Sequence, residues 1–136
     1  MASITAIEGI GKRNAAKLTK EGINTCEKLL EAGATRKGRK QIADSCGISD
    51  KRVLEWVNRA DLMRVKGVST QYSDLLEAAG VDTVKELRRR NAASLQAKMA
   101  EVNAKKKVPY VRQVPAVTQV QRWIDHAKTL EPVVKH

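Results

Sequence analysis

The chain has 136 residues, and 26 Lys and Arg against 15 Asp and Glu give it a formal net charge of +11 at pH 7. A protein this basic is expected to bind a polyanion, although a merely solvated basic surface is the simpler alternative. It contains no run of about 18 apolar residues and no basic leader followed by an apolar stretch, which excludes a membrane-spanning helix and predicts a cytoplasmic protein.

The first predicted elements are a short helix that Ser3 caps, reaching Glu8, and a tight turn at Gly9–Gly11. The two glycines permit the positive φ of such a turn, and the apolar residue between them is expected to point into the core. A helix begins at Lys12, so its unpaired N–H groups, its positive dipole end and the side chains of Lys12 and Arg13 coincide. This arrangement predicts a phosphate site, with a purely structural turn as the alternative.

Further short helices follow at close intervals. One ends at Gly22, and Thr25 and Thr35 are expected to cap the next two. A second turn, Gly47–Ser49, leads to a helix on which Trp56 and its apolar neighbours recur at three- and four-residue steps. This spacing is typical of a helix with one buried face, so Trp56 is predicted to lie in the core.

Four cations stand close together at the start of the helix predicted over residues 36–45. They are Arg36, Lys37, Arg39 and Lys40. Cations are slightly unfavourable at a helix N-terminus, which favours a use for them as a second anion contact. A flexible solvated edge is the alternative.

The chain repeats itself at an offset of 58 residues (67 − 9 and 87 − 29). Four residues of the first half recur in the second: Gly9, Gly22, Thr25 and Leu29 match Gly67, Gly80, Thr83 and Leu87. Four matches at one offset, two of them glycines, predict two structural repeats, which we place at residues 1–64 and 65–136. The second repeat opens with a turn at Val65–Ser69, and Trp123 on its last helix corresponds to Trp56.

The second repeat is expected to contain a longer basic loop. A helix is predicted over residues 92–102, a loop over 103–114, and a last helix that begins near Pro115. Cations surround Tyr110 in this loop: Lys105, Lys106, Lys107 and Arg112. Single-strand binders combine cations and stacking rings in this way, and a mobile solvated loop is the alternative.

The turns and their flanking helices resemble the tandem helix-hairpin-helix proteins of bacteria over nearly the whole chain. The residues that carry the resemblance are Gly9–Gly11, the continuation Gly22, Ile23, Thr25 and Leu29, and Gly47, Ile48 and Ser49 with Trp56. The chain is most similar to a bacterial family catalogued only as a domain of unknown function. The resemblance implies an all-α, SAM/helix-hairpin-helix-like fold of two tandem repeats with about nine or ten short helices.

The resemblance also implies a function for the first turn. In such modules hairpin N–H groups grip the minor-groove side of a duplex without reading its sequence. Gly9, Ile10 and Gly11 occupy the phosphate-cradling positions, and Lys12 and Arg13 form the basic flank. The other two turns have a serine in place of the second glycine, so only the first keeps the full pattern.

Two functions remain open from the sequence. The first is a non-enzymatic, sequence-independent DNA-binding protein, and the second is an interaction scaffold whose basic face docks an acidic protein. No motif for catalysis or for a cofactor is present. Cys26 and Cys46 lack metal-binding spacing, so we expect reduced core thiols and no metal site.

Overall fold

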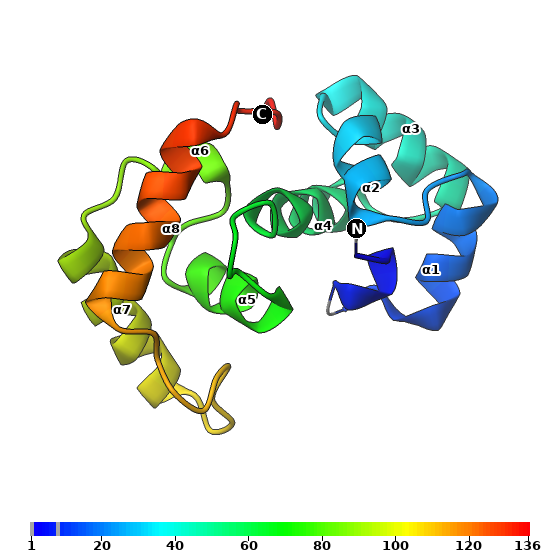
Figure 1. Ribbon diagram of the computed structural model, residues 1–136. Helices are drawn as coiled ribbons and strands as arrows, with labels where there is room; N and C mark the ends of the chain where they lie inside the picture. Colours follow the sequence, from blue (N-terminus) through cyan, green and yellow to red (C-terminus); the bar gives the residue numbers. More distant parts are fainter. Residues whose placement is uncertain (1, 8) are drawn as a thin grey trace. The chain divides into compact units, whose positions relative to one another are not determined.

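The computed structural model describes residues 2–7 and 9–136 of the chain (Figure 1). Within these residues it has eight α-helices, one 3-10 helix and no strand, apart from an isolated β-bridge between Ser3 and Thr25. The predicted all-α fold is confirmed, and the eight α-helices are slightly fewer than the nine or ten short helices predicted. No helix in the described part is long and apolar enough to cross a membrane. The chain divides into two compact units, one reaching Asp61 and including Val133–His136, the other comprising Leu62–Pro132.

The first unit contains five helical elements: η1 (Ile4–Ala6), α1 (Gly11–Lys20), α2 (Cys26–Ala32), α3 (Arg36–Cys46) and α4 (Asp50–Leu62). The predicted end of the first helix at Glu8 lies outside the described residues. Thr25 and Thr35 cap α2 and α3, because their hydroxyls accept the N–H groups of Lys28 and Gly38, both at 3.1 Å. The core of the unit includes Ile4, Ile10, Leu18, Leu29, Val53 and Trp56.

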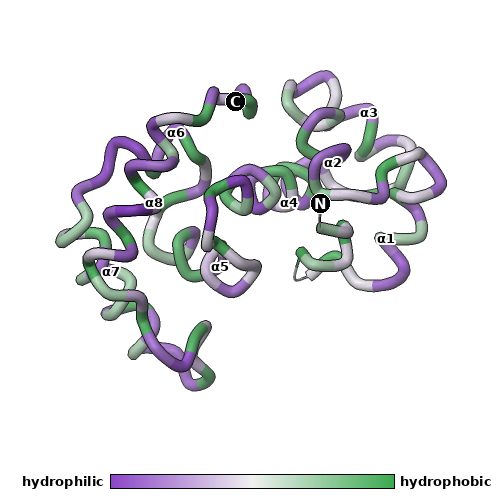
Figure 2. The backbone as a smooth tube through the Cα atoms, viewed as in Figure 1, coloured by the Kyte–Doolittle hydropathy of each residue, from purple (hydrophilic) through white to green (hydrophobic). Residues whose placement is uncertain are grey.

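The second unit contains α5 (Thr70–Ala78), α6 (Val84–Leu87), α7 (Ala92–Lys105) and α8 (Val117–Thr129). Helix α8 packs against α6 and α7, and α5 packs against α7. Hydrophobic and hydrophilic residues alternate along these helices, as they do in the first unit, so each helix has an apolar side to bury (Figure 2). The core includes Leu75, Leu87, Leu95, Met99, Val120 and Trp123. Both tryptophans are only 2% exposed, as predicted for core residues.

Residues that match in the sequence at the offset of 58 also match in local geometry. Gly9 and Gly67 have φ of 91° and 93°, in the region that L side chains rarely adopt. Thr25 and Thr83 both cap a helix by accepting the N–H three residues later. Leu29 and Leu87 are both fully buried. The same local interactions therefore recur in the two units.

The loop between α7 and α8 is shorter than predicted. Helix α7 continues to Lys105, so the first three residues of the predicted 103–114 loop are helical. The extension places Asn103 on the buried side, where its amide donates to Val111 O at 3.1 Å and its Oδ1 accepts Val111 N–H at 3.2 Å. These two bonds satisfy the backbone of Val111 and fix the loop to the helix.

Candidate nucleic-acid interface

The turn at Gly9–Gly11 is open to solvent on its backbone side. Both glycines are exposed, with φ of 91° and 72°, while Ile10 between them is 2% exposed and anchors the turn in the core. A Cβ atom added at Gly9 or Gly11 would meet no atom of the described residues within 4 Å. A ligand of the size of a phosphate can therefore approach the backbone closely here.

Helix α1 begins directly from this turn without a side-chain cap. Its N-cap residue is Ile10, whose side chain forms no hydrogen bond to the helix. A hydroxyl or amide side chain caps six of the other seven α-helices in the described residues, and the helix that begins after Ala116 is the exception. The six caps are Thr25, Thr35, Ser49, Ser69, Thr83 and Asn91. The first N–H groups of α1 consequently lack the partner that a cap would give them, and an anion can supply it.

Three cations surround this uncapped end. Lys12 and Arg13 are exposed on the first turn of α1, as the sequence predicted. Arg52 of α4 joins them: its Nη2 donates to Gly9 O at 3.2 Å, and its Cζ lies 5.5 Å from the centroid of the Trp56 ring. Arg52 thus donates to the carbonyl of the turn and adds a positive charge beside it, a role that no sequence signal indicated.

The cationic cluster at the start of α3 lies away from the turn Gly9–Gly11. Figure 1 shows the beginning of α3 and the beginning of α1 at opposite ends of the first unit. Arg36, Lys37 and Lys40 are exposed there. They do not share one phosphate site with the turn.

Arg39 does not belong to an exposed cluster, so its prediction as a nucleic-acid contact was wrong. The residue is 5% exposed. Its guanidinium donates to Gly33 O at 2.8 Å, to Ala34 O at 3.2 Å and to Lys135 O at 2.8 Å. Burial, together with the nearby charge of Arg36, lowers the pKa of Arg39. Its donors are used to join the end of α2 to the C-terminal segment.

The turn Val65–Ser69 is covered by residues of α8, whereas the turn Gly9–Gly11 is open. Lys66 N–H donates to Nδ1 of His126 on α8 at 2.9 Å. A Cβ added at Gly67 would lie 3.1 Å from Nε1 of Trp123, also on α8. The hydroxyl of Ser69 accepts Tyr72 N–H at 3.4 Å, so it caps α5. The serine at position 69 predicted a weaker match at this turn, and no sequence signal pointed to the contact of His126.

The basic residues at the end of α7 and in the loop after it differ in their surroundings. Lys105 donates to Glu101 Oε1 at 2.8 Å, and this bond lowers the pKa of Glu101. The ammonium of Lys106 lies 4.3 Å from the centroid of the Tyr110 ring. Lys107 and Arg112 are exposed. The loop therefore presents its charge around a half-buried ring.

In the part of the chain that the structure describes, the fold and this surface define an all-α protein with an open, uncapped turn beside three cations. The model of the family described as "Domain of unknown function (DUF4332)" matches residues 8–130, and the chain belongs to this family. The predicted membership of a family catalogued as a domain of unknown function is thereby confirmed. A search of the curated proteins and a search of the solved structures each found no match.

Proposed function

We propose that the protein binds DNA without catalysis and without reading its sequence, by holding a phosphate of the backbone at the turn Gly9–Gly11. The observation that carries this proposal is the uncapped start of α1, which leaves N–H donors without a side-chain partner in an exposed turn. Lys12, Arg13 and Arg52 supply the positive charge beside it. Backbone donors and flexible cations contact phosphates and carry no information about base edges.

We further propose that the two units are tandem helix-hairpin-helix repeats. The matched φ angles of Gly9 and Gly67, the matched caps of Thr25 and Thr83, and the two buried tryptophans support a common repeat. Only the first repeat keeps its turn free. Because residues of α8 cover the turn Val65–Ser69, we assign the phosphate contact to the first repeat alone.

The test exchanges glycines for valine at matched positions. A double variant, Gly9→Val and Gly11→Val, keeps the net charge but places side chains where the phosphate would approach. Gly22→Val with Gly47→Val is the control, because these glycines also have positive φ and equally open surroundings. Both pairs should cost similar backbone strain, which circular dichroism and thermal melting would compare.

We expect the first pair to weaken the binding of a random 20-base-pair duplex about tenfold or more in fluorescence anisotropy, because charge-assisted hydrogen bonds are lost. The control pair should leave binding within about twofold of wild type. Equal losses in both variants would show that strain, and not the turn itself, controls binding. Absence of duplex binding by the wild type at low salt would refute the proposal.

An interaction scaffold is the second candidate function, and the position of the α3 cations favours it. Arg36, Lys37 and Lys40 form a separate basic surface at the other end of the first unit from the turn (Figure 1). An acidic protein bound there would lose affinity when these three residues become alanine. It would be indifferent to the glycine variants, which separates the two functions.

A further inference from the structure

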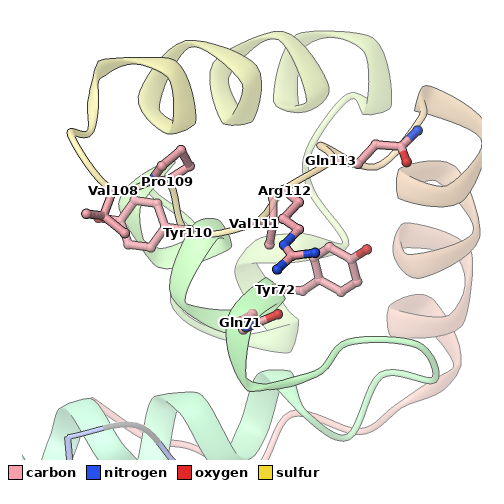
Figure 3. A pocket seen from close by; sticks show the side chains of 8 residues that line it. All are labelled: Gln71, Tyr72, Val108, Pro109, Tyr110, Val111, Arg112 and Gln113. Carbon is pink, nitrogen blue, oxygen red and sulfur yellow. The ribbon is translucent and has the colours of Figure 1, made fainter.

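A hollow of about 560 Å³ opens on the surface of the second unit, between the start of α5 and the loop that follows α7 (Figure 3). Gln71 and Tyr72 come from α5, and Tyr110 to Gln113 come from the loop. The side chains that carry the argument are two aromatic rings, one cation and two carboxamides: Tyr72, Tyr110, Arg112, Gln71 and Gln113.

The walls of this hollow are held in place by contacts behind them. Tyr72 packs on Trp123 with ring centroids 5.1 Å apart. The loop wall is fixed at Val111 by the two hydrogen bonds to Asn103, a side chain that is only 7% exposed. Lys106 lies over the Tyr110 ring. A ligand would therefore meet a site that is already formed, which lowers the entropic cost of binding.

One apolar side chain at the rim is unusually exposed. Val108 lines the hollow and is 78% exposed, the largest exposed fraction among the large hydrophobic residues of the described chain. Exposed Lys107 precedes Val108 in the chain, and exposed Arg112 lines the same hollow. An apolar surface next to cations and half-buried rings suits a flat, partly apolar group attached to an anionic chain.

We propose that this hollow binds an unpaired nucleobase, with the phosphates of its strand on Lys107 and Arg112. A tyrosine face can stack on any base, and the amides of Gln71 and Gln113 can donate to and accept from its hydrogen-bonding edge. The eight lining residues include no carboxylate, so nothing in the wall repels a phosphate. The inference rests on the proposed function in taking nucleic acid as the partner, but it uses a different unit and a different contact.

The experiment measures the anisotropy of two labelled probes, a single-stranded ten-residue oligothymidylate and a blunt 20-base-pair duplex. Tyr110→Leu removes the stacking face while it keeps an apolar side chain, and Arg112→Ala removes one cation. Arg122→Ala on α8 is the matched control, because Arg122 is also exposed but does not line the hollow. Circular dichroism confirms that each variant is folded.

We expect Tyr110→Leu to raise the dissociation constant for the oligothymidylate about fivefold or more, as loss of one stacked base does. Arg112→Ala should weaken it more than Arg122→Ala does, and binding of the blunt duplex should change little. The variant with Gly9→Val and Gly11→Val should show the opposite pattern, with the duplex lost and the oligothymidylate retained.

Each contrary result has a distinct meaning. If the duplex binds and the oligothymidylate does not, or if Tyr110→Leu leaves oligothymidylate binding unchanged, the hollow is no base site and the proposed function still stands. If a polyglutamate peptide competes as well as the oligothymidylate does, the hollow recognises charge alone and the inference is overturned. If only the oligothymidylate binds, the turn proposal fails instead.

Discussion

Arg39 illustrates how a charged residue in a basic stretch can be structural. It stands between Gly38 and Lys40, and its sequence neighbours give no sign of its burial. In the folded chain its guanidinium supplies hydrogen bonds to three backbone carbonyls, two at the end of α2 and one in the C-terminal segment. A fork of five donors suits this task, and no other side chain offers as many.

Replacement of Arg39 by alanine should lower the free energy of unfolding by about 2 to 4 kcal/mol, because buried carbonyls lose charge-assisted partners and a cavity forms. Lys40→Ala, at the exposed neighbouring position, should change it by less than about 0.5 kcal/mol. Urea unfolding followed by circular dichroism measures both. A loss of duplex binding in Arg39→Ala, with stability unchanged, would instead restore Arg39 to the interface.

The two cysteines are free and buried, as predicted. Burial raises the pKa of the Cys26 thiol above its ordinary value of 9.0, and burial with the charge of Glu21 raises the pKa of Cys46. The unfolded chain therefore loses these protons at lower pH than the folded chain does. The stabilisation that the neutral thiols give is fully present below about pH 9 and decreases as pH rises above it.

Both thiols should react with a thiol-specific disulfide reagent much more slowly in the native protein at pH 8 than in 6 M guanidinium. The free energy of unfolding should fall as pH rises above about 9, and it should fall less steeply in a variant with Cys26→Ala and Cys46→Ala. Parallel pH curves for the two proteins would show that other groups cause the decrease.

At the scale of elements, the side chain before each helix decides what its first turn can do. The hydroxyls of Thr25, Thr35 and Thr83 cap the N-termini of their helices. The side chain of Ile10 is buried in the core instead and leaves the start of α1 uncapped. The same principle governs the end of α7, where Asn103 turns inward and closes the following loop.

Replacement of Asn103 by alanine should release this loop. The N–H and C=O of Val111 would lose their partners, so we expect a loss of about 2 kcal/mol in the free energy of unfolding. The amide of Val111 should also exchange with deuterium much faster. Lys107→Ala, a change of an exposed residue in the same loop, is the control. Unchanged protection of Val111 in Asn103→Ala would mean that packing alone holds the loop.

At the scale of the whole molecule, the net charge of +11 says only that a polyanion is favoured, while the positions of the cations limit how many can act at one site. Arg39 is buried and hydrogen-bonded to backbone carbonyls, and Lys105 is paired with Glu101. Lys12, Arg13 and Arg52 remain around the open turn. On the proposed function, these three residues and not the total charge should set the number of phosphates that the turn holds.

If these three cations each neutralise one phosphate, the logarithm of duplex affinity should fall with the logarithm of salt concentration at a slope of about −3. Lys12→Ala should reduce this slope by about one, and Lys20→Ala at the far end of α1 should leave it unchanged. Titrations at four salt concentrations between 25 and 200 mM would measure it. A flat response would exclude backbone binding at the turn.

The sequence alone was sufficient for the features that depend on neighbours along the chain. The glycines at 9 and 11, the caps at Thr25 and Thr35 and the apolar spacing around Trp56 each act within a few residues. They predicted the all-α fold, the open first turn and the buried tryptophans, and the sequence also indicated the family.

Only the tertiary structure decided which charges are free and which turn is open. Arg39 reaches Lys135 across 96 positions, His126 reaches Lys66 across 60, and Arg52 reaches Gly9 across 43. Helical periodicity shows that a residue lies on a polar or an apolar face, but it does not show what packs against that face. Because the fold decides which donors of a cation or of the backbone are already used, these long-range contacts determine the candidate site.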